Sequence, residues 1–192
     1  MNATLWEQMI RQLQMRWEDL LIAFVQHIQL VGVSMAIAIA LGVPLGVLIT
    51  RAAFLRSGVL GTAGVLQTIP SLALLGFMIP LLGIGVPTAV AALFLYSLLP
   101  IIRNTYTGIR DVDKSIIEAA RGMGMTDLQI LIRVQFPLAL SVIMAGIRTA
   151  TVINVGTATL AAFIGAGGLG DFIFLGIARS IDALVLLGAI PA

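Results

Sequence analysis

Long apolar stretches separated by short charged segments dominate the pattern of this sequence. Leu20 to Thr50 contains no Asp, Glu, Lys or Arg, and neither does Ser57 to Ile102. A membrane-spanning helix needs about 20 apolar residues, so the first stretch fits one span and the second is long enough for two. Glycine and proline from Gly83 to Pro87 favour a tight connection between those two spans.

Apolar sequence resumes from Pro137 to Phe163, interrupted by Arg148, and returns at the C-terminal end. That last run is too short to cross a bilayer, so we expect its helix to be incomplete in this chain. The pattern predicts an all-α, polytopic membrane protein that forms one domain over residues 1–192. The predicted spans are 28–50, 58–82, 87–105, 137–163 and 182–192.

The N-terminal segment has an amphipathic pattern of its own. Apolar residues recur there at spacings of three and four, which places them on one helix face: Trp6, Ile10, Leu13, Trp17 and Leu21. This pattern predicts a helix over residues 1–26 that lies in the membrane interface, with its tryptophans at headgroup depth. The alternative is a plain exposed extension.

Composition agrees with a membrane protein and narrows the chemistry. Hydrophobic residues make up 59% of the chain and charged residues 10%, where a soluble protein carries about 25% charged residues. The sequence has no cysteine and one histidine, His27. Zinc sites with cysteine ligands and Cys-His nucleophile pairs are therefore excluded, and we predict no metal site and no catalytic residue.

The positions of the basic residues predict the orientation. Cytoplasmic loops of membrane proteins are enriched in Lys and Arg. Three basic residues fall on one side of the predicted spans, Arg11, Arg16 and Arg179. Seven fall on the other side: Arg51, Arg56, Arg103, Arg110, Lys114, Arg121 and Arg133. The loop over residues 106–136 is therefore expected in the cytoplasm and the N-terminus outside.

That charged loop has the signals of two short helices. Asp113 is placed to cap a helix that runs to Arg121, and Gly122 and Gly124 can end it in a left-handed turn. Thr126 and Gln129 have the spacing of a capping box, which opens a second helix toward Pro137. The first helix carries one acid, Glu118, among small and flexible apolar residues. Such a face favours docking into a partner protein, the alternative being a helix packed on its own spans.

The same loop resembles a known family motif. Glu118-Ala119-Ala120, three residues, Gly124, nine residues and Val134-Gln135-Phe136-Pro137 is similar to the EAA loop of ABC importer permeases. That motif has isoleucine and leucine where this chain has Val134 and Phe136, and every spacing is kept. The resemblance implies the five-span type I fold and a coupling helix seated on a cytoplasmic ATPase. The coupling residues that it implies are Glu118, Ala119, Ala120, Gly124 and Pro137.

A narrower resemblance concerns the substrate. The stretches Leu66–Ala73, Leu98–Tyr106 and Phe163–Gly170 resemble permeases for glycine betaine, carnitine and choline; methionine-importer permeases share parts of them. The resemblance implies a bacterial inner-membrane permease subunit for such an osmoprotectant, with methionine as the alternative. It also implies a second permease subunit, identical or related, and an extracytoplasmic binding protein. The chain has no phosphate-binding loop, because its only lysine, Lys114, follows Asp113, so ATP is expected on the partner.

Polar residues inside the spans are candidates for the substrate pathway. Arg148, Thr151 and Asn154 recur at a spacing of three on the fourth span, and a charge in a membrane is costly unless it faces protein or water. Gln67 and Ser71 flank Pro70, which suggests a kinked or unwound stretch in the second span. The alternative for the three residues of the fourth span is hydrogen bonding between packed helices. For Gln67 and Ser71 the alternative is a kink that serves packing alone.

Two glycine motifs match patterns of other protein classes, and we reject both interpretations. Gly165 to Gly170 fits the dinucleotide-binding pattern G-x-G-x-x-G, but no strand precedes it, so we expect a turn or re-entrant loop. Gly168 to Asp171 resembles the Gly-x-Gly-Asp signature of intramembrane aspartyl proteases, whose chemistry needs a second carboxylate that the spans lack. The competing classes for the chain are such a protease and a membrane scaffold that only docks a cytoplasmic protein.

Overall fold

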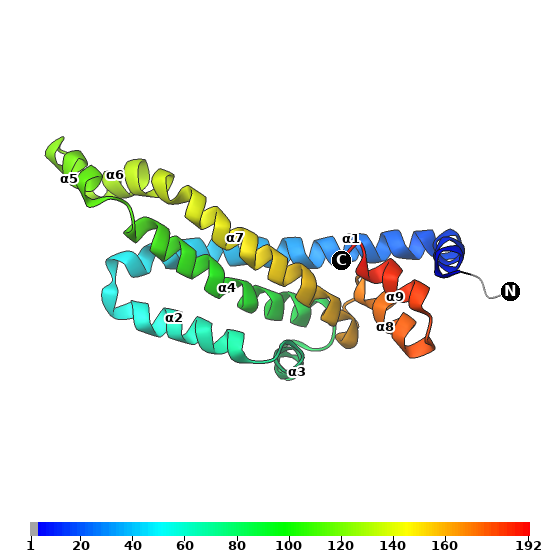
Figure 1. Cartoon of the computed structure of the whole chain (residues 1–192). Helices are drawn as coiled ribbons and strands as arrows, with labels where there is room; N and C mark the ends of the chain where they lie inside the picture. Colours follow the sequence, from blue (N-terminus) through cyan, green and yellow to red (C-terminus); the bar gives the residue numbers. More distant parts are fainter. Residues whose placement is uncertain (1–3) are drawn as a thin grey trace. The chain divides into compact units, whose positions relative to one another are not determined.

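The computed structural model describes residues 4–192, and among them it contains helices, turns and no strand (Figure 1). An all-α fold is therefore confirmed. The α-helices are α1 (Leu5–Arg51), α2 (Ala53–Thr68), α3 (Ser71–Leu82), α4 (Val86–Arg110), α5 (Lys114–Gly122), α6 (Asp127–Ile130), α7 (Phe136–Ala158), α8 (Gly170–Arg179) and α9 (Asp182–Ala189). A π turn (Leu131–Gln135) precedes α7 and a 3-10 turn (Thr159–Ile164) follows it.

Three helical stretches within residues 4–192 are long and apolar enough to cross a membrane: Leu5–Arg51, Val86–Arg110 and Asp127–Ile164. The pair α2 and α3 makes a fourth if it counts as one span. The two helices of that pair are separated at Ile69 and Pro70, inside the predicted span 58–82. Proline lacks the N–H that would continue a helix, so it explains the interruption. The fifth predicted span corresponds to the short helix α9.

The N-terminal segment is part of the long helix α1. The backbone of α1 leaves helical φ/ψ at Arg16 (φ −133, ψ 23) and continues as a helix to Arg51, through the predicted boundary between the interfacial segment and the first span. The apolar stripe is solvent-exposed along this part of α1, with Trp6 68% and Trp17 53% exposed. A helix that exposes tryptophans in this way has the surface that an interfacial position requires.

The described chain divides into two compact units. Unit 1 comprises the chain up to Met35, Ile69–Phe94 and Val152–Ala192, and unit 2 comprises Ala36–Thr68 and Leu95–Thr151.

Glycines bring the helices of unit 2 close to α4. A Cβ placed on Gly46 of α1 would lie 2.6 Å from the Cβ of Thr105, and one on Gly42 would lie 2.9 Å from Ile101. These two glycines form a G-x-x-x-G pair on one face of α1, the arrangement that lets membrane helices approach closely. The helix α7 also packs closely against α4, because a Cβ on Gly146 would lie 2.8 Å from the carbonyl oxygen of Pro100.

Polar contacts in unit 1 join α1 to the C-terminal part of the chain. The Nδ2 of Asn154 donates to the Oγ of Ser34 at 2.8 Å, and the Nε2 of His27 donates to the carbonyl oxygen of Val155 at 3.2 Å. The amide of Gly168 donates to Oε1 of Gln26 at 3.1 Å. The glycine stretch Gly165–Gly170 is thus a turn held against α1, with positive φ at Gly165, Gly167 and Gly168.

Candidate functional site

The first helix of the charged loop begins as the sequence predicts. Asp113 is the N-cap of α5, and its Oδ1 accepts a hydrogen bond from the Ser115 amide at 2.8 Å. Hydrogen bonds from the backbone and then the side chain of Ser115 hold the pKa of the Asp113 carboxyl below its ordinary value. The carboxylate is therefore charged at neutral pH and favours the positive end of the helix dipole.

Gly124 ends α5. Its φ of +81 lies in the left-handed region, whereas Gly122 is the last residue of the helix itself. The amide of Gly124 donates to the Arg121 carbonyl at 3.0 Å, and the amide of Met125 donates to the Ala120 carbonyl at 3.2 Å. These two bonds form a Schellman motif. The glycine of the motif Glu-Ala-Ala-x-x-x-Gly thus stands where an L side chain would be strained.

The second helix also starts as predicted. Thr126 and Gln129 form both hydrogen bonds of a capping box, at 2.9 Å and 3.3 Å. The guanidinium of Arg121 lies 3.1 Å from the Asp127 carboxylate, across the turn between α5 and α6. Both side chains are more than 60% exposed. An ion pair so exposed contributes about 0–1 kcal/mol to stability. The Schellman motif at Gly124 and the capping box at Thr126 therefore stabilise the turn more than the ion pair does.

One buried side chain fastens the loop to the rest of unit 2. The Oε1 of Gln135 accepts from Nη2 of Arg51 at 3.0 Å, and its Nε2 donates to the Ile109 carbonyl at 3.3 Å. Arg51 also donates to the Asp127 carbonyl at 3.4 Å. Gln135 thereby links the ends of α1 and α4 to the start of α7. Sequence reasoning missed this role, because Gln135 occupies a variable position of the motif and Arg51 is 84 residues away.

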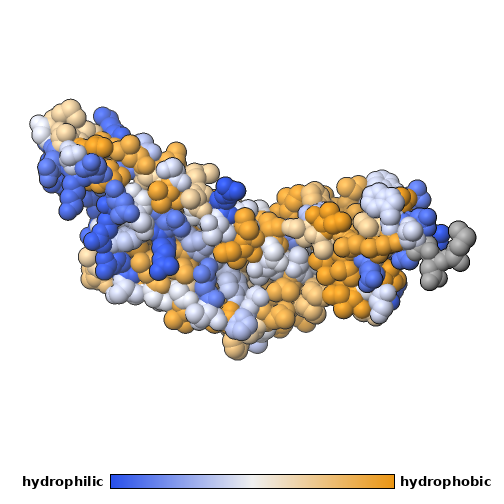
Figure 2. Space-filling view, in the orientation of Figure 1, coloured by the Kyte–Doolittle hydropathy of each residue, from blue (hydrophilic) through white to orange (hydrophobic). Residues whose placement is uncertain are grey.

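The motif residues divide between two faces of α5. Glu118 and Ala119 are exposed, while Ala120 is buried, with 2% of its surface exposed. Large apolar side chains are exposed close to them in the sequence, including Ile116 and Met123, the latter at 75%. Figure 2 shows hydrophilic residues gathered over the end of unit 2 that carries α5 and α6, with apolar atoms among them. An exposed acid beside exposed apolar groups is the surface that a docked partner would cover.

Pro137 lies at the first turn of α7, directly after a π turn. The Phe136 amide donates to the Leu131 carbonyl, five residues back. Proline has no N–H to donate to the carbonyl four residues before it, so the regular helical pattern cannot run through this point. The wider π turn forms where that pattern is interrupted, and such turns are frequent at functional sites.

The candidate pathway residue Gln67 has a structural partner in unit 2. Its Nε2 donates to the Tyr96 carbonyl at 2.9 Å. Pro100, four residues after Tyr96 in α4, has no N–H to donate to that carbonyl. Gln67 therefore replaces the helical hydrogen bond that Pro100 removes, which is how membrane helices accommodate proline.

The other four candidates have different surroundings. Asn154 is fully buried in unit 1 in its hydrogen bond to Ser34. The Thr151 hydroxyl donates to the carbonyl of Ile147 in its own helix at 2.9 Å. Ser71 is half-buried at the first turn of α3. Arg148 is exposed on α7, inside a candidate span. Asn154 and Gln67 thus make helix-to-helix contacts, and Arg148 presents a charge on the surface of the chain.

The two glycines at the C-terminal end of α5, Gly122 inside the helix and Gly124 beyond it, allow a matched test of the Schellman motif. Gly124→Ala should destabilise the turn by about 1 kcal/mol, because alanine disfavours the left-handed region. Gly122→Ala should leave it unchanged or stabilise it, because Gly122 is helical and a Cβ there meets nothing within 4 Å. Hydrogen exchange at the amides of Gly124 and Met125 measures the difference. Equal exchange rates in the two variants would contradict this assignment of Gly124.

A double-mutant cycle tests the partnership of Gln67 and Pro100. Gln67→Leu removes the donor that Gln67 offers to the Tyr96 carbonyl and should lower stability by about 1–3 kcal/mol. In a Pro100→Ala background the same change should cost clearly less, because the alanine restores the helical N–H donor at that position. Thermal unfolding in detergent gives both values. A cost of Gln67→Leu that is the same in the two backgrounds would mean that the side chain serves another purpose.

Comparison with known proteins agrees with this architecture. Residues 17–192 match the family described as binding-protein-dependent transport system inner membrane component. The chain is 51% identical over 173 residues to the carnitine transport permease protein OpuCB of Listeria monocytogenes, covering 90% of this chain and 79% of that protein. It is 46% identical over 184 residues to the glycine betaine/carnitine/choline transport system permease protein OpuCB of Bacillus subtilis (strain 168), covering 96% and 85%.

A solved structure shares the fold. An inward-facing structure of the methionine ABC transporter MetNI matches with a TM-score of 0.79 at 27% sequence identity, covering 92% of this chain and 90% of that chain. The relatives are transport permeases, so the chain is a transport protein and not an intramembrane protease or a scaffold. The family implies an ATPase and a substrate-binding protein as partners in general. This chain belongs to the inner-membrane components of binding-protein-dependent transport systems, the permease subunits of ABC importers, and has their type I fold.

Proposed function

We propose that this permease forms, with a second copy or a related subunit, the membrane pathway for an osmoprotectant such as glycine betaine, carnitine or choline. The observation that carries the substrate class is the identity of about half the residues to permeases named for these compounds. Methionine is the weaker candidate, because the methionine transporter resembles the chain at 27% identity. Selection among solutes falls to the extracytoplasmic binding protein, which delivers its ligand to the permease.

The proposed contact with the ATPase subunit is the exposed face of α5. Glu118 and Ala119 meet the cytoplasmic ATPase, Ala120 and Gly124 hold the helix in place, and Pro137 marks where the loop enters α7. ATP binds to the partner. Its binding and hydrolysis move α5, and the movement passes into α7 through Gln135 and into α1 through Arg51. Rigid-body rocking of the spans then alternates outward and inward access.

The proposed orientation has α5 and α6 in the cytoplasm and the N-terminus outside. It is supported by the seven basic residues in loops on one side against three on the other. In that orientation the tryptophan-bearing part of α1 lies at the outer surface, at headgroup depth.

Among the five pathway candidates, Arg148 is the one that we propose faces the route or the neighbouring permease subunit. An exposed guanidinium within a span is too costly to face lipid, by roughly 2.5–3.5 kcal/mol. Thr151 follows it by three residues on the same helix. The hydrogen bonds of Gln67 and Asn154 support helix packing for those two residues, and Ser71 stays a candidate at the interruption of the second span.

Uptake into vesicles tests the proposal. Proteoliposomes with the permease, its ATPase and its binding protein should take up labelled glycine betaine, carnitine or choline only when ATP is present on the ATPase side. Glu118→Ala should reduce that uptake at least tenfold, because loss of an interfacial charged contact costs about 2–5 kcal/mol.

Lys114→Ala is the matched control, since Lys114 is an exposed residue of the same helix outside the motif. It should leave uptake and ATPase co-purification near the wild-type values. Uptake of methionine and of none of the three osmoprotectants would refute the substrate class. A Glu118→Ala variant that transports and retains the ATPase normally would refute the coupling role.

A further inference from the structure

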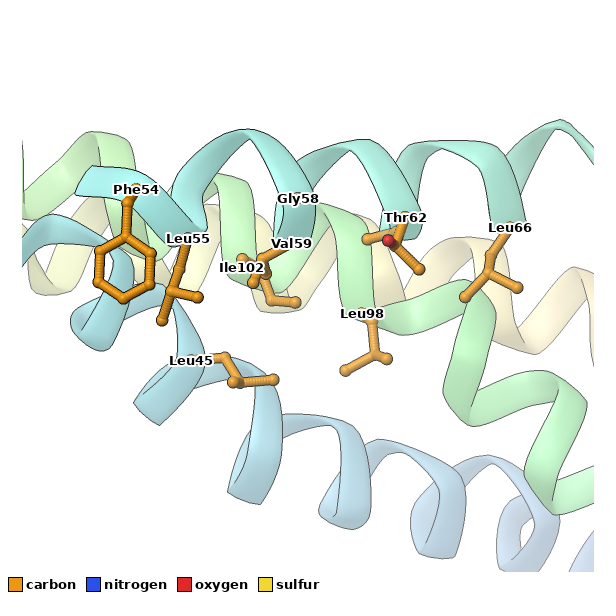
Figure 3. A pocket seen from close by; sticks show the side chains of 10 residues that line it. Leu45, Phe54, Leu55, Gly58, Val59, Thr62, Leu66, Leu98 and Ile102 are labelled. Atoms are coloured by element: carbon orange, nitrogen blue, oxygen red, sulfur yellow. The ribbon is translucent and has the colours of Figure 1, made fainter. Parts of the chain in front are cut away.

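An apolar groove lies between α1, α2 and α4 of unit 2. Its volume is about 420 Å³ (Figure 3). Its walls carry aliphatic and aromatic side chains with one hydroxyl, from Leu45, Phe54, Leu55, Gly58, Val59, Thr62, Ala63, Leu66, Leu98 and Ile102. Figure 3 shows the labelled residues on three helices around one space. Apolar walls in a membrane protein fit an apolar occupant.

The groove has the length of a lipid chain. Phe54 and Leu66 line it twelve positions apart on α2, which corresponds to about 18 Å along a helix. One leaflet is half of a hydrocarbon core that is ~30 Å thick. The groove therefore extends from the end of α2 that adjoins Arg51 through about the depth of one leaflet.

Two cations converge at that end of the groove. Nη1 of Arg56 donates to the hydroxyl of Tyr106 at 3.0 Å, and Nη1 of Arg110 donates to the same oxygen. The two guanidinium carbons lie 5.8 Å and 5.7 Å from the centre of the Tyr106 ring, within cation–π range. Tyr106 therefore holds two like charges close together.

The described part of the chain pairs neither arginine with a carboxylate. Within residues 4–192 the ion pair present is Arg121 with Asp127, so neither Arg56 nor Arg110 has an acidic partner. The cluster is continuous with the groove, because Arg56 follows the lining residue Leu55 and Tyr106 lies one helical turn beyond the lining residue Ile102. Two uncompensated guanidinium groups beside an apolar channel suit an anionic head joined to an apolar tail.

We propose that this groove is a binding site for an anionic glycerophospholipid of the leaflet that meets the α5 and α6 end of unit 2. One acyl chain lies along α2 between Leu45 and Leu98, and the phosphodiester binds Arg56 and Arg110. Basic pockets between membrane helices are known to bind such head groups. A second protein chain could also cover the apolar walls, but it would match both features only if it also brought an acidic residue to Arg56 and Arg110. A phospholipid carries the anion and the apolar tail in one molecule.

Native mass spectrometry measures the proposed binding directly. The full chain, purified in non-ionic detergent with the subunits that accompany it, is titrated with palmitoyl-oleoyl phosphatidylglycerol and, separately, with palmitoyl-oleoyl phosphatidylcholine. The anionic lipid should bind more tightly. Arg56→Gln and Arg110→Gln should each weaken it about fivefold, the effect of one basic residue near an anionic head group. Arg133→Gln, an exposed arginine of the π turn, should leave it unchanged.

Two glycines of α2 give a matched test of the acyl-chain channel. Gly58 lines the groove and Gly61 does not, and a Cβ at either position meets nothing within 4 Å. Gly58→Leu should therefore fill the channel and abolish tight lipid binding, while Gly61→Leu should preserve it. Both variants should keep the unfolding temperature of the wild type or raise it, because leucine favours a helix over glycine.

Three results would each contradict a different part of the proposed lipid site. Equal binding by Gly58→Leu and Gly61→Leu would show that the lipid lies elsewhere and would overturn the site. Equal affinity for the two lipids would overturn the role of the arginines. If Gly58→Leu separates the permease subunits and lipid binding is unchanged, the groove is an interface between chains and the proposal is wrong.

Discussion

Close approach of helices at glycine is the constraint on which unit 2 depends. In a membrane the lipid tails are as apolar as the side chains, so helix association relies on tight packing and on hydrogen bonds between helices. Gly42 and Gly46 allow α1 to pack closely against α4. Gly146 allows α7 to pack against α4 near Pro100. Larger side chains at these positions would separate α1, α4 and α7, and the segment with α5 and α6 connects the last two of these helices.

Hydrogen bonds between helices add to the close glycine packing in unit 2. Pro100 removes the helical donor from a carbonyl of α4, and Gln67 of α2 supplies one. At the other end Gln135 accepts from Arg51 and donates to Ile109, so it joins three helices through one buried amide. Unsatisfied polar groups are costly in a lipid-embedded protein, so these bonds define both position and register. The segment that contains α5 is therefore hydrogen-bonded to the ends of α1 and α4.

Local features were predictable from sequence, and contacts between distant segments were not. The cap at Asp113, the capping box at Thr126 and the turn at Gly124 depend on residues within a few positions, and the structure confirms each of them. Gln67 was expected at a kink in its own helix, but its partner is the carbonyl of Tyr96 on another helix, 29 positions later in the sequence. The pairing of Arg51 with Gln135 has no local signal for the same reason. Membrane character and the motif spacing decided the family; packing decided the roles of the polar residues.

The central claim is that the exposed face of α5 docks the ATPase. The sequence has no cysteine, so Ala119→Cys provides a single thiol at an exposed motif position with a minimal change of side chain. The measurement is the rate at which maleimide labels that thiol in the permease alone and in the assembled transporter. The account predicts rapid labelling of the permease alone and protection in the complex that contains the ATPase. Equal labelling rates in the two states, with transport intact, would contradict it.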